Sequence, residues 1–169
     1  MPKRVLIFDT SILCCLLKVP GKETAGTNDD RWDHDRVRNH LAAASADDST
    51  FVLPLASIVE TGNHIAQAPG DRFAIAKGLA DLIRSAADQA SPWPAFAEQA
   101  DLWGTEALRR LADTWPVMAG RRESIGDATS RDVAEYYARA GFAVEILTAD
   151  AGLKAYQPAE PVMIPRRRR

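Results

Sequence analysis

Cysteine, aromatic residues and long apolar runs are all scarce in this chain, and the first and last of these scarcities each exclude a class of protein. Only two residues are cysteines, Cys14 and Cys15. Adjacent cysteines rarely bridge, which excludes a disulfide-stabilised secreted domain. No apolar run approaches the ~18 residues of a membrane span, and we find no secretory signal before the first apolar segment. We therefore expect a soluble, cytoplasmic protein with no membrane partner and two reduced thiols in its core.

A strong positive charge is also lacking. The formal net charge is −2, although the last four residues, 166–169, are all arginine. The 21 basic residues less these four leave 17 against 23 acidic ones, a balance of −6. The body of the chain is therefore not a general nucleic-acid binder, and any such binding depends on local patches or the tail. We predict a single domain over 1–165 and a basic C-terminal tail over 166–169.

Short apolar segments alternate with helical patterns along the chain. Strands are predicted at 4–8, 51–55, 143–148 and, at the edge of the sheet, 162–164. Helices are predicted over 12–17, 32–44, 71–90, 95–103, 105–114, 127–141 and 151–156, with a further helix capped by Ser57. This order predicts an α/β fold with a central parallel sheet flanked by helices and an expanded helical segment in mid-chain.

Four acidic residues stand just past core segments of the chain, and they are Asp9, Glu60, Asp127 and Asp150. The carboxyl ends of parallel strands form the edge where open α/β folds bind ligands. Carboxylates gathered there would repel one another by about 4 kcal/mol per close pair at an effective dielectric near 20. A cation would remove that repulsion, and oxygen ligands suit Mg²⁺ or Mn²⁺. The pattern therefore predicts a metal-dependent phosphodiesterase.

The first two acids also have structural interpretations. Asp9 could serve only as a helix N-cap, and Glu60 could close a capping box with Ser57, because the spacing Ser-x-x-Glu is typical of that motif. Thr10 and Ser11 could hydrogen-bond a carboxylate or a phosphate oxygen. A phosphatase with Asp9 as nucleophile is an alternative enzyme, but it would want a second aspartate where Ser11 stands.

The third acid has two candidates, Asp127 and Asp132. Five residues along a helix turn the side chain by about 500°, so these carboxylates diverge by roughly 140° and are not expected to bind one ion. We favour Asp127 because Ser-Ile-Gly precedes it. Asn63 shares the helical face of Glu60 and could fix that carboxylate or touch substrate, and Thr148 could orient a ligand.

Taken in order, the motifs resemble those of a known family. Asp-Thr-Ser at 9–11, the glutamate at 60, Ser-Ile-Gly-Asp at 124–127 and Leu-Thr-Ala-Asp at 147–150 resemble the four acidic motifs of PIN-domain ribonucleases, especially the VapC-like toxins. The resemblance implies a three-layer α/β/α PIN-like fold. It implies that the catalytic, metal-binding residues are Asp9, Glu60, Asp127 and Asp150, supported by Thr10, Ser11 and Thr148.

The resemblance also implies an activity and partners. One or two Mg²⁺ or Mn²⁺ ions would support hydrolysis of RNA to 5′-phosphate and 3′-hydroxyl ends. The protein would be the toxin of a type II toxin–antitoxin pair, with an antitoxin protein as partner, and a homodimer. A catalytically degenerate PIN fold that serves as a binding scaffold is the non-enzymatic alternative.

This chain departs from the small VapC-like pattern in two ways. The segments 18–48 and 71–122 are expanded. The separation between Asp127 and Asp150 is wider than expected by about one helical turn, and measured from Asp132 it would fit better.

Basic and aromatic residues between the motifs have two interpretations each. Lys22, Arg31, Arg36 and Arg38 could line an RNA groove with Trp32 as a stacking platform, or form a charged helix that packs the tryptophan inward. The arginine pairs at 109–110 and 121–122 are candidate phosphate contacts or a solvated face. The sequence Asp-His-Asp at 33–35 favours helix capping over metal binding.

Overall fold

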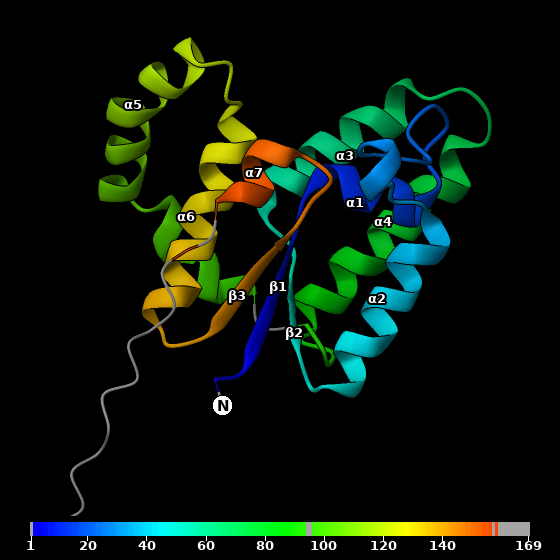
Figure 1. Ribbon diagram of the computed structural model, residues 1–169, viewed down its shortest axis with the longest axis horizontal. Coiled ribbons are helices and arrows are strands. Elements are labelled where there is room, and N and C mark those ends of the chain that lie inside the picture. The colour runs from blue at the N-terminus through cyan, green and yellow to red at the C-terminus, as the bar shows by residue number, and fades with distance from the viewer. Residues whose placement is uncertain (1, 94–95, 157, 159–169) are drawn as a thin grey trace, which may run out of the picture.

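Three parallel strands form the centre of the fold. The structure is a computed structural model that describes residues 2–93, 96–156 and 158. Strands β1 (Arg4–Phe8), β2 (Thr50–Val52) and β3 (Ala143–Leu147) lie in the order β2-β1-β3, with Leu6 opposite Phe51 and Glu145 (Figure 1). The parallel sheet predicted from the apolar runs is therefore confirmed within the described residues.

Helices cover both faces of this sheet because side chains along a strand alternate between faces. On one face, Leu6 and Phe8 pack in a cluster that includes residues of α1 (Thr10–Leu17), α2 (His34–Ala46) and α4 (Arg72–Ala87). On the other, Val5 and Ile7 pack with residues of α6 (Ile125–Arg139) and α7 (Ala151–Ala155). The protein is thus a mixed α/β fold with its sheet between two helical layers (Figure 1).

Helix α3 (Leu55–Gln67) follows β2, and the expanded segment predicted at 71–122 comes next. That segment is helical, as predicted, and comprises α4, the 3₁₀ segment η2 (Phe96–Trp103) and α5 (Thr105–Gly120). Helix α5 contains Pro116 and runs past the predicted end at 114. It lies at the periphery of the molecule, beyond α6 (Figure 1). Trp93, between α4 and η2 in the sequence, packs beside the sheet, where its ring contacts those of Phe8 and Phe51.

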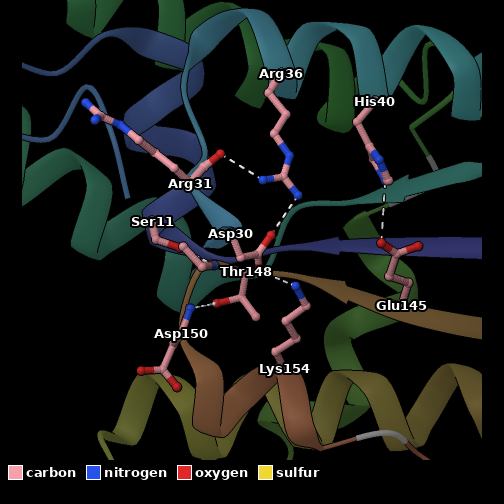
Figure 2. Close-up of polar contacts among 10 residues, drawn as sticks. Ser11, Asp30, Arg31, Arg36, His40, Glu145, Thr148, Asp150 and Lys154 are labelled. Atoms are coloured by element: carbon pink, nitrogen blue, oxygen red, sulfur yellow. Dashed lines mark hydrogen bonds and ion pairs between the residues drawn. The ribbon is translucent and has the colours of Figure 1, made fainter. Parts of the chain in front are cut away.

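The segment between α1 and α2 is a folded loop. Helix α1 ends at Leu17 with Lys18 as its C-cap, and the loop includes the short 3₁₀ helix η1 (Asn28–Asp30) and a backbone bridge between Ala25 and Trp32. The Asp30 carboxylate accepts a hydrogen bond of 2.7 Å from Arg36 of α2 and pairs with Lys154 of α7 (Figure 2). The loop is therefore tied to one helix on each side of the sheet.

Several predicted boundaries were wrong. The second strand ends at Val52 rather than at 55, and α3 begins at Leu55. Helix α2 begins at His34 with Asp33 as its N-cap, so Trp32 lies outside it. The strand predicted at 162–164 and the arginine tail lie outside the described residues. Within the part of the chain that is described, no helix is long and apolar enough to cross a membrane.

Candidate functional site

An open pocket of about 340 Å³ lies at the carboxyl edge of the sheet. Three of the four predicted acids line it, and they come from separate segments: Asp9 follows β1, Glu60 belongs to α3, and Asp127 lies in the first turn of α6. The other lining residues are Thr10, Ser11, Cys14, Gly21, Lys22, Thr24, Ala25, His64 and Ser124. The structure therefore brings three of the four predicted acids to one pocket, and Asp150 is not among its lining residues.

Asp9 is held in place by hydroxyl groups. Its Oδ2 accepts hydrogen bonds from the Ser11 hydroxyl at 2.6 Å, the Thr148 hydroxyl at 2.8 Å and the Ser11 backbone N–H at 3.3 Å. Asp9 is also the N-cap of α1, as its structural interpretation predicts. These bonds all use one oxygen, and among the described residues Oδ1 has no hydrogen-bond partner, so it is free to bind a ligand in the pocket.

Glu60 lies in the second turn of α3, and its side chain is half exposed. Its Oε2 accepts a hydrogen bond of 3.0 Å from the Thr10 hydroxyl, and its Oε1 lies 3.9 Å from His64 Nε2. Gly126 of α6 lies close by, because a Cβ added there would stand 3.3 Å from Glu60 Oε2. The absence of a side chain at 126 therefore leaves room for this carboxylate.

The capping box proposed for Ser57 and Glu60 does not form. Helix α3 begins two residues before Ser57, so the serine cannot be its N-cap. The buried Ser57 hydroxyl instead donates a hydrogen bond of 2.8 Å to the carbonyl oxygen of Phe8, at the end of β1. Glu60 is consequently free of the capping role and belongs to the pocket.

Asp127 takes part in the capping box that forms at this site. Its Oδ2 accepts from the Ser124 N–H at 3.1 Å, and its own N–H donates to the Ser124 hydroxyl at 3.0 Å. Asp132 lies elsewhere, in a pocket of about 440 Å³ with Arg110, Glu135 and Arg139 among its lining residues. Burial is the main influence on Asp132 and raises its pKa. Of the two candidates, only Asp127 shares a pocket with Asp9.

Asp150 is directed elsewhere. It is exposed, its Oδ1 caps α7 by accepting from Leu153 N–H at 2.8 Å, and it is not among the residues that line the pocket. Figure 2 shows its carboxylate pointing away from Ser11 and Thr148. Its backbone nevertheless belongs to the network under the site, since the Asp150 N–H donates to the Thr148 hydroxyl at 3.0 Å.

Two of the supporting residues connect distant parts of the chain. The Thr148 hydroxyl donates to Asp9 and accepts from Asp150, and the Ser11 hydroxyl donates to Asp9 and accepts from the Ala149 N–H at 3.1 Å. These bonds fasten the end of β3 to the start of α1. Asn63, by contrast, is exposed and does not line the pocket.

Sequence reasoning missed His64 and Cys14 as pocket residues. His64 stands one helical turn after Glu60 and lines the pocket in place of Asn63, which the spacing i, i+4 could have indicated. Burial raises the pKa of the Cys14 thiol to about 12, with Lys22 lowering it and Cys15, Glu60 and Asp9 raising it further. A thiol of that pKa is not a nucleophile at neutral pH.

Two basic residues of the loop and α2, Arg36 and Lys22, have different surroundings. Arg36 lies over the ring of Trp32 at 4.0 Å and pairs with Asp30. Trp32 itself is 5% exposed, so the predicted stacking platform for RNA bases is wrong, and the alternative in which the tryptophan packs inward is confirmed. Lys22 alone among the four predicted groove residues lines the acidic pocket.

The donor set of the pocket is carboxylate and hydroxyl oxygen, which suits Mg²⁺ or Mn²⁺. Among the described residues, no three His, Cys, Asp or Glu side chains stand close enough together to hold a metal ion by themselves. Mg²⁺ is commonly bound through one or two carboxylates with waters in its other positions. The carboxylate oxygens of Asp9, Glu60 and Asp127 are ligands of the kind that such an ion binds. Comparison of the chain with models of protein families, with curated proteins and with solved structures finds no match.

Proposed function

We propose that this protein is a metal-dependent endoribonuclease with a PIN-like α/β/α fold. The observation that carries the proposal is the pocket lined by Asp9, Glu60 and Asp127, carboxylates from three segments that meet at the carboxyl edge of a parallel sheet. The motifs in which they stand, and the order of these motifs, resemble those of PIN-domain ribonucleases and supply the reaction class.

One or two of these carboxylates would hold Mg²⁺ or Mn²⁺, with waters in the remaining positions of the ion. A bound ion would lower the pKa of a bound water and neutralise charge on the scissile phosphate. The protein's own part is to fix the acids in place: Ser11 and Thr148 hold one oxygen of Asp9, and Thr10 holds one oxygen of Glu60. Such hydrogen bonds to ligands orient them and are worth about 10–100-fold in metal affinity or activity.

No side-chain nucleophile is required by this chemistry. Cys14, the one thiol that lines the pocket, is protonated at neutral pH because its pKa is about 12. Ser11 has its hydroxyl hydrogen committed to Asp9. Metal-assisted attack by water is therefore favoured over covalent catalysis by Ser11 or Cys14.

The test is cleavage of RNA in the presence of Mn²⁺ by the full chain and four variants. Asp9→Asn and Glu60→Gln are expected to lose at least about 100-fold in rate, since each removes a charged ligand. Asp132→Asn is the matched control, because it removes a carboxylate from the other pocket, and it should cleave like the unaltered protein. Asp150→Asn should lose less than Asp9→Asn, because its carboxylate caps α7.

The products and a second substrate separate the alternatives. Cleavage fragments should carry 5′-phosphate and 3′-hydroxyl ends. A phospho-aspartate at Asp9 after incubation with a phosphate monoester would assign the phosphatase alternative instead. If the unaltered chain binds neither Mn²⁺ nor RNA, the nuclease proposal is wrong and the scaffold alternative is favoured.

The toxin role rests on the motifs alone, and so does the homodimer. For the toxin, expression should arrest growth and deplete RNA pools, and Asp9→Asn should abolish both effects. Equal growth with both proteins would refute the role.

A further inference from the structure

We propose that Lys22 is a substrate-binding residue that contacts an RNA phosphate at the acidic pocket, presented there by the turn that follows α1. This inference rests on the proposed nuclease function and adds to it the residue that receives the anionic backbone. Lys22 lines the same pocket as Asp9, Glu60 and Asp127, opposite in charge to all three.

The turn that carries Lys22 is well anchored. The Lys22 N–H donates to the carbonyl oxygen of Val19 at 2.8 Å, and Val19 is 1% exposed, so the turn begins in the core. Pro20 and Gly21 occupy its two central positions, and Gly21 has a φ of +81°. Proline followed by a residue of positive φ is the signature of a type II turn, which Gly21 adopts without strain. The lysine is thereby held at the pocket by backbone geometry.

The rest of the loop keeps this wall of the pocket in place. Thr24 and Ala25 also line the pocket, and Ala25 forms the backbone bridge to Trp32. A Cβ at Gly26 would stand 2.2 Å from the carbonyl oxygen of Asp30, so the chain folds closely on itself there. Asp30 in turn is tied to Arg36 and Lys154 (Figure 2).

The Lys22 ammonium is available for a ligand. Among the described residues it forms no ion pair, whereas Arg36 and Lys154, the cations on either side of the loop, are both paired with Asp30. Its charge acts on Cys14, another lining residue of the pocket, since Lys22 lowers the pKa of that thiol while Glu60 and Asp9 raise it. Lys22 is thus a cation near the acids that no ion pair within the described part of the chain neutralises.

The charge balance of the pocket indicates what Lys22 could contribute to substrate binding. Three carboxylates and one divalent ion leave a net charge of −1, which repels a phosphate. Lys22 brings the pocket to neutrality, and its ammonium can donate hydrogen bonds to phosphate oxygens. An RNA strand could then approach the acids at a lower electrostatic cost.

The experiment measures binding and cleavage separately. Binding of a fluorescein-labelled, mixed-sequence single-stranded RNA of about 12 nucleotides, a length within the usual site sizes, is followed by anisotropy in Mg²⁺ at several salt concentrations. The background is Asp9→Asn, in which the RNA stays intact. Adding Lys22→Gln should weaken binding about three- to fivefold and reduce the slope of log K against log salt by about 0.7, the value for one phosphate contact on a single strand.

Two further variants serve as controls. Lys22→Arg should restore most of the affinity, because it keeps the charge. Lys18→Gln removes the same charge from the same loop at an exposed residue that does not line the pocket, and it should bind like the parent. In the cleaving protein, Lys22→Gln should raise KM more than it lowers kcat.

The outcomes are distinguishable from a failure of the nuclease proposal. If the unaltered protein cleaves RNA and Lys22→Gln leaves affinity, salt slope and KM unchanged, the role of Lys22 is wrong and the nuclease stands. If Lys22→Gln strengthens Mn²⁺ binding without weakening RNA binding, the lysine is only a counter-ion for the acids, and the inference is again wrong. If the unaltered protein neither binds nor cleaves RNA, both proposals are wrong.

Discussion

Gly126→Ala should separate the stability of the fold from the function of the pocket. Gly126 is the second residue of α6, and its φ lies outside the left-handed region, so alanine is compatible with the backbone. Replacing glycine by alanine at such a position stabilises a protein by about 0.4–1 kcal/mol. For a domain of this size, that corresponds to a rise in Tm of roughly 1–4 °C.

The same methyl group should disturb Glu60. It would stand 3.3 Å from Glu60 Oε2 and 3.4 Å from the Ser124 hydroxyl, and Oε2 is the oxygen that accepts from Thr10. The carboxylate lies at the end of a half-exposed side chain, so it can move by a few tenths of an ångström at little cost in folding energy. A displacement of 1 Å at a reacting centre costs about 100-fold in rate, so we expect a loss of roughly threefold to tenfold.

The matched control is Gly120→Ala at the end of α5, where an added Cβ meets nothing within 4 Å. Thermal unfolding and RNA cleavage are measured for both variants. Gly120→Ala should leave the rate and the Mn²⁺ affinity unchanged, whereas Gly126→Ala should lower both while remaining folded. If Gly126→Ala cleaves RNA at the rate of the control, the position of Glu60 does not matter, and the reasoning is refuted.

Three further predictions concern other parts of the fold. Burial raises the pKa of Cys14 to about 12 and that of Cys15 to about 11, so neither thiol should react with a thiol reagent at pH 8 until the protein is denatured. Labelling of the native protein would contradict their burial. Ser57→Ala should destabilise the fold by about 1 kcal/mol in urea unfolding because the hydrogen bond to Phe8 is lost, and an unchanged midpoint would show that this bond contributes nothing. The pKa of Asp30 is lowered, first by its hydrogen bond from Lys154 and next by that from Arg36, so the stability that Asp30 gives the loop should be present above the ordinary aspartate range and be lost as pH falls through the lowered pKa. Asp30→Ala should therefore speed amide exchange over 21–32 at neutral pH. Identical exchange in both proteins would mean that the ion pairs of Asp30 do not restrain the loop.

Elements with a strong local signal could be predicted from the sequence. The strand predicted at 4–8 is confirmed, because a short continuous apolar run bounded by polar residues has few other stable arrangements. Asp71 and Asp33 cap α4 and α2, since a short acidic side chain before a helical pattern satisfies free N–H groups. These features depend on neighbours in sequence.

Features that depend on tertiary contacts could not be predicted. The Ser57–Glu60 spacing matches a capping box, but the hydrogen bond from Ser57 to Phe8 belongs to a strand 49 residues away. The capping box of Ser124 with Asp127 and the cap of α7 by Asp150 are different, because each joins residues three positions apart and could have been predicted from the spacing.

The site itself was predictable in outline only. The motif order indicated which carboxylates follow the core segments, and three of them do share a pocket. The place of Lys22 beside the acids depends on the path of the loop, which the sequence does not show, whereas His64 could have been found from its spacing of four residues from Glu60.

Calorimetric titration with Mn²⁺ tests the central claim most directly, because it requires no knowledge of the RNA. The unaltered protein should bind Mn²⁺, Asp127→Asn should bind it at least about tenfold more weakly, and Asp132→Asn should bind it as the unaltered protein does. Asparagine can still accept the Ser124 N–H, so Asp127→Asn should keep its helix cap. Absence of Mn²⁺ binding by the unaltered protein, or an equal loss in both variants, would contradict the account.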